Sequence, residues 1–163
     1  MAFDKSKYRK GYSIGVGGVV LYQDKVLLVR RRMGSHSGDW ALPGGYVEHG
    51  EAIDVAVKRE VLEEAGVEAV VEGLIAVRSR VIESGVENSA YFIFLLKSSN
   101  SNTDADGIEV EKARFFNFKE VQELPRLQAL SRLVITNILR GEAKILTFHA
   151  HPNLPVEEYV IYA

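Results

Sequence analysis

The sequence of 163 residues contains no cysteine. This absence excludes a disulfide scaffold, a thiolate zinc site and a cysteine nucleophile, and it agrees with a reducing compartment. The sequence also lacks an apolar run of the roughly 20 residues that span a bilayer. Residues 1–10 are polar and do not resemble a secretory signal. We therefore expect a cytoplasmic protein with no membrane partner.

Charge of one sign is not in excess either. Twenty Lys and Arg residues stand against 22 Asp and Glu residues, for a formal net charge of −2. We expect no nucleic-acid partner, because no bulk basic surface is present to neutralise phosphates. The length fits one domain, and 47% hydrophobic with 26% charged residues is typical of a globular chain. We predict a flexible basic lead over residues 1–12, a main domain over 13–141, and an extension over 142–163 packed on the same domain.

The apolar pattern predicts a mixed α/β fold. A hairpin is expected first, with a turn at Gln23-Asp24, and the glycines of its first strand indicate a bulge or a close backbone approach. A helix without Gly or Pro then ends at Gly66, which suits a C-terminal cap. The predicted strands cover residues 14–22, 25–31, 67–81, 90–96, 108–116, 144–148 and 159–162, and the predicted helices cover 51–65 and 126–140.

The first predicted helix carries a cluster of carboxylates. Glu60, Glu63 and Glu64 are spaced i, i+3, i+4 and therefore share one helix face. The neighbouring cations Lys58 and Arg59 are expected to point elsewhere on the helical wheel. Carboxylates crowded in this way suit a hard divalent cation such as Mg²⁺, which takes oxygen ligands. The alternative is an acidic face exposed to solvent.

The segment around this helix, GYVEHGEAIDVAVKREVLEEAGV over residues 45–67, resembles the Nudix box, G-x5-E-x7-R-E-U-x-E-E-x-G-U with U aliphatic. Trp40 and the Leu-Pro-Gly-Gly run before the helix are also similar to that family. The resemblance implies a single-domain α/β/α sandwich with a mixed sheet, and makes residues 13–141 a Nudix hydrolase domain. Every fixed position matches: Gly45, Glu51, Arg59, Glu60, Glu63, Glu64 and Gly66, with Val61 and Val67 at the aliphatic positions.

The resemblance implies hydrolysis of a pyrophosphate bond in a nucleoside diphosphate linked to another moiety, dependent on Mg²⁺ or Mn²⁺. Carried over residue by residue, Glu60, Glu63 and Glu64 would bind the metal, and the carbonyl of Gly44 would complete its coordination. Arg59 would orient a ligand glutamate. Gly45, Glu51 and Gly66 would have structural roles. The general base is left open between Glu63 and a residue outside the box, for which Glu109 is the first choice and Glu111 the second.

Further residues are substrate-binding candidates. Strand alternation places Arg30 and Arg32 on one face and Arg31 on the other, near the expected entry of a phosphate-bearing ligand, with a solvent-exposed strand end as the alternative. Trp40 is a candidate for stacking on a base, with packing in the core as the alternative. Residues 33–38 are a lid candidate, with an ordinary surface loop as the alternative. His149 and His151 share a strand face, but no third metal ligand is near them in the sequence.

The substrate is the least determined part of the prediction. The lead-in to the helix resembles those of ADP-ribose and NADH pyrophosphatases, so ADP-ribose or another nucleotide sugar is the first expectation. The alternatives are a MutT-like nucleoside triphosphate pyrophosphohydrolase and a non-catalytic nucleotide-binding module. Homodimers are common in the resembling family, so the resemblance allows a homodimer, and the sequence itself leaves the oligomeric state open.

Overall fold

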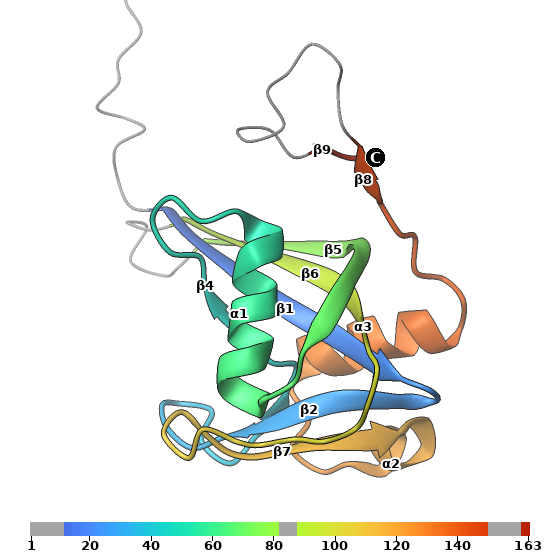
Figure 1. Cartoon of the computed structure of the whole chain (residues 1–163). Coiled ribbons are helices and arrows are strands. Elements are labelled where there is room, and N and C mark those ends of the chain that lie inside the picture. The colour runs from blue at the N-terminus through green and yellow to red at the C-terminus, as the bar shows by residue number, and fades with distance from the viewer. Residues whose placement is uncertain (1–11, 82–87, 150–160) are drawn as a thin grey trace, which may run out of the picture.

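The computed structural model describes residues 12–81, 88–149 and 161–163 (Figure 1). Apart from Tyr12, the predicted basic lead lies outside these ranges. The chain begins with the predicted hairpin. Strand β1 (Tyr12–Tyr22) and strand β2 (Lys25–Arg31) pair antiparallel, with Tyr22 opposite Lys25. Gln23 adopts a positive φ of 52° in the turn between them. The hairpin prediction is confirmed.

Within the described residues, seven strands form one mixed sheet. Strand β1 pairs parallel with β6, and the other pairings of this sheet are antiparallel. The order along the sheet is β3-β2-β1-β6-β5, while β4 pairs with β1 and β7 pairs with β2. The remaining strands of the sheet are β3 (Trp40–Ala41), β4 (Gly44–Tyr46), β5 (Ala69–Val81), β6 (Asn88–Ser98) and β7 (Val110–Asn117).

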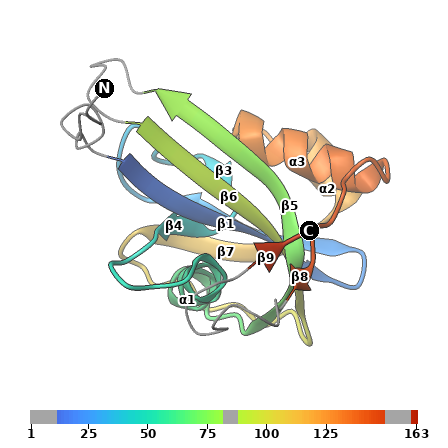
Figure 2. The same ribbon diagram turned by 90° about the horizontal axis from the view of Figure 1, so that it is seen from above.

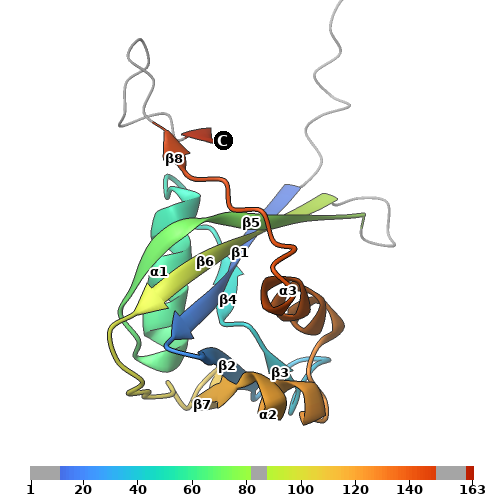
Figure 3. The same ribbon diagram turned by 90° about the vertical axis from the view of Figure 1, so that its right-hand side faces the viewer.

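Helices cover both faces of this sheet, as Figures 2 and 3 show. Helix α1 (Ile53–Ala65) packs on one face and helix α3 (Ala129–Leu139) on the other. The strands alternate between the two cores: Val20 faces the α1 cluster, and Val19 faces the α3 cluster. Because both faces are covered, the strands are apolar on both sides. The predicted α/β/α sandwich with a mixed sheet is confirmed.

Local sequence signals explain where the helices end. Gly66 caps α1 with φ 65°, in the left-handed region where glycine carries no Cβ penalty, and its N–H donates to the carbonyl of Leu62. Helix α2 (Phe118–Glu123) was not predicted, although Asn117 and Glu120 form a capping box that the sequence spells out. Helix α3 is shorter than the predicted range 126–140 because Gln128 is its N-cap.

The C-terminal segment contacts the sheet and its core through Leu146 and Tyr162. Leu146 exchanges backbone hydrogen bonds of 2.9 Å with Leu74 of β5. Strands β8 (Phe148–His149) and β9 (Ile161–Tyr162) pair with each other, and the Tyr162 ring packs edge-on against Phe94 at 5.5 Å. The predicted strand over residues 144–148 is thus reduced to its end. None of the helices in the described ranges is long and apolar enough to cross a membrane.

Candidate active site

Arg59 of α1 connects four parts of the site. Its Nε and Nη2 atoms donate to the two carboxylate oxygens of Glu51, both at 2.9 Å, and Nη2 also donates to the Tyr46 carbonyl at 3.0 Å. Its Nη1 atom donates to Glu60 at 2.9 Å and to Glu63 at 3.0 Å. The prediction that Arg59 points away from the acidic face was therefore wrong. A long side chain can fold back along the helix, so a helical wheel does not fix where its charge lies.

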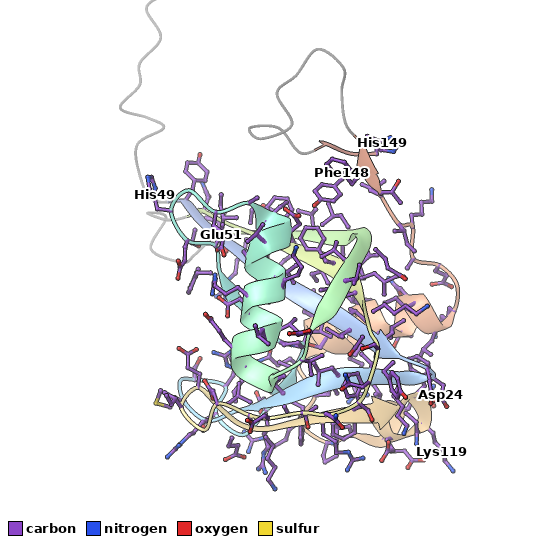
Figure 4. The ribbon with its side chains drawn as sticks, in the orientation of Figure 1. Asp24, His49, Glu51, Lys119, Phe148 and His149 are labelled. Atoms are coloured by element: carbon purple, nitrogen blue, oxygen red, sulfur yellow. The ribbon has the colours of Figure 1, made fainter. Side chains whose placement is uncertain are left out.

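Glu51, which is labelled in Figure 4, lies in the loop just before α1 and binds the Arg59 guanidinium from there. Its carboxylate also accepts a 3.0 Å hydrogen bond from the Glu48 backbone N–H. The hydrogen bonds from Arg59 hold the pKa of Glu51 below its usual value, and those of Glu51 raise the pKa of Arg59. Two parallel charge-assisted bonds fix the guanidinium plane as well as its position. Glu51 therefore positions Arg59, and through it the carboxylates of Glu60 and Glu63.

Glu64 is the most buried acidic residue of the site, with only 4% of its surface exposed. The backbone N–H of Gly44 donates a 2.8 Å hydrogen bond to its Oε2 atom. Burial raises the pKa of the Glu64 carboxyl to about 7, and the negative charges of Glu60 and Glu109 act in the same direction. Within the described residues Glu64 forms no ion pair, although the charge of Arg31 acts on it, and a buried carboxylate without a paired cation is costly. A positive charge placed there would be strongly stabilised.

Glu60 lies directly over Gly45. A Cβ atom on Gly45 would stand 2.6 Å from all three atoms of the Glu60 carboxyl group, so only glycine leaves the space that this carboxylate occupies. Burial raises the pKa of Glu60, and the bonds from Arg59 offset part of this effect. Glu63 is more open, with 58% of its side chain exposed. The three carboxylates therefore range from buried to exposed along one helix face.

Gly66 and the loop before β7 complete the frame around α1. Gly66 packs against Asp104, whose backbone N–H donates to the Ala65 carbonyl at 2.8 Å. Two residues later, the carboxylate of Asp106 accepts hydrogen bonds from the backbone N–H groups of residues 108–110. This tight turn presents Glu109 to the cleft, where its charge acts on both Glu60 and Glu64.

These carboxylates line a cleft of about 790 Å³ that runs from α1 to the beginning of α3. The cleft also has a basic part, formed by Arg31 of β2 and by Arg78 and Arg80 of β5. Residues 33–36 of the lid candidate line it as well. The acidic lining residues are Glu48, Glu60, Glu63, Glu64, Asp106 and Glu109. A cleft with an acidic part and a basic part suits a ligand that carries phosphates together with a cation.

The structure does not bring the predicted substrate-binding residues into this cleft. Arg30 forms a 2.9 Å ion pair with Glu111, and Arg32 donates to the Gly107 carbonyl. Trp40 packs edge-on against Phe116 at 4.8 Å, in the core beneath α3. Arg31, which the alternation placed opposite Arg30 and Arg32, lines the cleft instead. A β-bulge between Arg30 and Arg31 shifts the pairing with β7 at this point.

Several cleft residues were missed by the sequence analysis. Arg78 and Arg80 come from the far end of β5, and Ser89 and Tyr91 come from β6 opposite them. The sequence did contain a signal for the first two: Arg78 and Arg80 are two positions apart on one predicted strand, so their side chains lie on the same face of the sheet. His149 lies on β8, labelled in Figure 4, where its ring nitrogen lies 3.1 Å from the Ala163 carbonyl. His151 is outside the described residues.

The donor set fits a hard divalent cation, although it is not a closed cage. Among the described residues, no group of three or more His, Cys, Asp or Glu side chains is arranged to hold a metal ion by itself. Arg59 occupies one oxygen each of Glu60 and Glu63. Mg²⁺ is usually bound through one or two carboxylates together with water and substrate phosphates. Glu64 and Glu60, whose negative charge acts on Glu64, are two carboxylates of that kind.

The fold is an α/β/α sandwich, and its cleft brings carboxylates and arginines together. The family model described as NUDIX domain matches residues 11–137, and the chain belongs to this family of hydrolases. It is 31% identical over 139 residues to an ADP-ribose pyrophosphatase of Methanocaldococcus jannaschii, covering 84% of this chain and 80% of that protein. A MutT-like protein of Streptomyces ambofaciens is 42% identical over 66 residues, 40% of this chain and 42% of that protein.

The fold is shared with solved structures of the same family. A NUDIX hydrolase from Nitrosomonas europaea superposes with a TM-score of 0.69 at 26% sequence identity, covering 80% of this chain and 72% of that one.

Proposed function

We propose that the protein hydrolyses the pyrophosphate bond of ADP-ribose or of a similar nucleotide sugar, with Mg²⁺ or Mn²⁺ as cofactor. The observation that carries this proposal is the buried Glu64 carboxylate beside Gly44, within a cleft that is also lined by four arginines. The likeness to an ADP-ribose pyrophosphatase along most of both chains supports this choice of substrate.

The α1 carboxylates form the cation site in this proposal. Glu60, Glu63 and Glu64 would hold the ion, and the carbonyl of Gly44 would complete its coordination. When bound, the cation supplies neutralisation of phosphate charge and activation of water. Arg59 acts on the site as a positioning residue, because it bonds Glu60 and Glu63 while Glu51 holds it in place.

Glu109 is the proposed general base. It would accept a proton from the water that attacks phosphorus, while one phosphate leaves with the bridging oxygen. Glu63 is the second choice, because its Oε2 atom already accepts a hydrogen bond from Arg59. Within the described ranges Glu109 makes no ion pair, and its position in the cleft suits the role. Glu111 is less suited, because it pairs with Arg30.

A substrate panel tests the proposal. The purified protein is incubated with Mg²⁺, and separately with Mn²⁺, against ADP-ribose, UDP-sugars, NADH, diadenosine polyphosphates, coenzyme A and oxidised dGTP. Phosphate release after added phosphatase reports cleavage. We expect ADP-ribose or another nucleotide sugar to dominate, with a nucleoside monophosphate and a sugar phosphate as products. No cleavage of any nucleotide sugar would contradict the proposed substrate.

A MutT-like nucleoside triphosphate pyrophosphohydrolase is the second candidate, and the likeness to a MutT-like protein over the region of the box supports it. Preferred cleavage of oxidised dGTP, with release of inorganic pyrophosphate, would favour it over the first. A non-catalytic nucleotide-binding module is disfavoured because every box glutamate is present. The homodimer and the cytoplasmic location stay predictions.

A further inference from the structure

Tyr91 of β6 lies in a slot that three glycines keep open. A Cβ atom on Gly15 would stand 2.7 Å from its ring, and one on Gly17 or on Gly44 would stand 2.6 Å from its hydroxyl oxygen. These glycines come from two different strands, β1 and β4. The backbone of β1 and β4 therefore lies close to the tyrosine ring. The Tyr91 hydroxyl lies next to Gly44, and the N–H of Gly44 donates to Glu64.

The Tyr91 hydroxyl has the position and the chemistry of a ligand contact. The side chain lines the cleft beside the acidic residues of α1. Among the hydrogen bonds of the described residues, none involves this hydroxyl, so both its donor and its acceptor capacity are available. A phenol otherwise buried in a polar site normally finds a partner. A phosphate oxygen beside a cation held by Glu64 would supply one.

Arg78 continues the same surface away from the acidic end. Its guanidinium carbon lies 5.3 Å from the centroid of the Tyr91 ring, and its Nη2 atom donates to the Ser89 hydroxyl at 3.2 Å. Arg78 and Tyr91 are directly opposite each other in the pairing of β5 with β6. No ion pair engages Arg78 in the ranges that the structure describes. Its remaining N–H groups can therefore bind an anion, and Tyr91 and Ser89 restrict where they point.

We propose that Tyr91 and Arg78 form a phosphate-binding pair, which holds the pyrophosphate of the substrate opposite the α1 carboxylates. The Tyr91 hydroxyl donates to one phosphate oxygen at the acidic end, and the Arg78 guanidinium binds the oxygens that face away from it. This inference rests on the proposed function, since it needs a pyrophosphate in this cleft. It also gives a reason for glycine at 15, 17 and 44, where any larger residue would displace the tyrosine.

Binding of inorganic pyrophosphate in the presence of Mg²⁺ tests the pair without any turnover. Calorimetric titrations compare the wild type with Tyr91→Phe, which keeps the ring in its slot, and with Arg78→Gln. Tyr22→Phe is the matched control, because Tyr22 packs on Phe115 outside the cleft. We expect each of the first two variants to weaken pyrophosphate binding by about 10-fold to 100-fold, as for a lost hydrogen bond to a charged group. Tyr22→Phe should bind like the wild type.

Three further readings make the test decisive. Titration with Mg²⁺ alone should give the same affinity in all four proteins, which shows that the cation site is intact. Unchanged pyrophosphate binding by Tyr91→Phe would overturn its part of the proposal, and if that variant does not fold, Arg78→Gln decides in its place. If Tyr91→Phe and Arg78→Gln raise the KM for ADP-ribose but bind pyrophosphate like the wild type, these side chains contact the sugar or the base. That result would overturn the proposal that they bind phosphate.

The two proposals can fail separately. If the wild type cleaves no nucleotide sugar but pyrophosphate binding still weakens in Tyr91→Phe and Arg78→Gln, the phosphate-binding pair stands and the proposed substrate falls. If ADP-ribose is cleaved and both variants keep wild-type pyrophosphate binding and wild-type kcat/KM, the proposed function stands and the pair is wrong.

Discussion

The backbone N–H of Gly44 donates a 2.8 Å hydrogen bond to the Oε2 atom of Glu64 and thereby joins β4 to the buried side of α1. Gly44 is itself held in the sheet opposite Gly17 of β1. The most buried carboxylate of the site is thus fixed by the backbone, and its more exposed neighbours are fixed by Arg59.

Replacing Arg59 with Lys should lower activity much more than stability. A lysine ammonium cannot form the bidentate pair with Glu51 and at the same time bond Glu60 and Glu63. We expect kcat/KM to fall by about 10-fold to 100-fold, the range seen when an outer partner of a metal ligand is lost. Steady-state kinetics with a Mg²⁺ titration measure this effect. Lys58→Arg, a reciprocal change at an exposed neighbour, is the control, and equal kinetics of both variants would contradict the role of Arg59.

Two glycine variants should separate the site from the fold. In Gly45→Ala the three atoms nearest the new methyl group belong to the end of the Glu60 side chain, which can move aside. We expect this variant to fold and to bind Mg²⁺ at least about 10-fold more weakly. In Gly44→Ala the methyl group would stand 2.1 Å from the Val16 carbonyl oxygen, which belongs to the sheet and cannot give way.

Thermal unfolding and Mg²⁺ titration of both glycine variants check this difference. Gly44→Ala should lower Tm by far more than Gly45→Ala. A Gly45→Ala protein with wild-type affinity for Mg²⁺ would show that the position of the Glu60 carboxylate does not matter for the cation.

The metal-free protein should become less stable as the pH rises, through Glu64. Its pKa of about 7 in the folded state lies above the ordinary value of 4.5, so the folded state holds the extra proton between these values. The stability contributed by the neutral acid is present below about pH 4.5 and is lost as the pH rises through about 7. Glu64→Gln cannot titrate. We therefore compare the unfolding free energies of Glu64→Gln and the wild type in EDTA. The variant's value minus the wild-type value should rise by about 1–3 kcal/mol from pH 5 to pH 8, because only the wild type loses stability through this group.

Urea unfolding at several pH values in EDTA measures this difference. Glu68→Gln, at an exposed carboxylate just beyond α1, is the matched control and should follow the wild type at every pH. Parallel curves for the wild type and Glu64→Gln would show that the Glu64 carboxyl does not carry the shifted pKa.

Much of the site could be predicted from the sequence because its residues are close together in the chain. Glu51, Arg59, the three glutamates and Gly66 lie within one loop and one helix, so their spacing alone places them on α1 and at its ends, and Gly45 lies on the short strand just before them. Gly66 shows this most clearly, because a glycine after a helix without Gly or Pro indicates a left-handed cap.

The opposite side of the cleft could not be predicted in the same way. Strand β2 is apolar on both faces, with Leu27 in one core and Leu28 in the other, so its pattern does not tell which face leads to the cleft. This is why Arg30 and Arg32 were favoured over Arg31. Arg78 and Tyr91 meet only through the pairing of β5 with β6, a long-range contact that no local pattern encodes.

His149→Ala should leave activity unchanged within about twofold. His149 lies on β8 and is not among the residues that line the cleft. The change removes the contacts of the ring with the Thr147 hydroxyl and the Ala163 carbonyl, both of which lie in the C-terminal segment. Steady-state rates and Tm of the variant and the wild type give the comparison. A large loss of rate with a normal Tm would mean that the C-terminal segment takes part in the reaction.

The most direct test of the account is ADP-ribose turnover by the wild type, Glu63→Gln and Glu64→Gln, with Glu68→Gln as the control, each with Mg²⁺ and again in EDTA. We predict that the wild type and Glu68→Gln form AMP and ribose 5-phosphate only with the cation present. The Glu63→Gln and Glu64→Gln variants should keep the fold and lose turnover by roughly 100-fold or more. Near-wild-type turnover by both variants, or undiminished wild-type turnover in EDTA, would contradict the claim that the α1 carboxylates hold a catalytic cation.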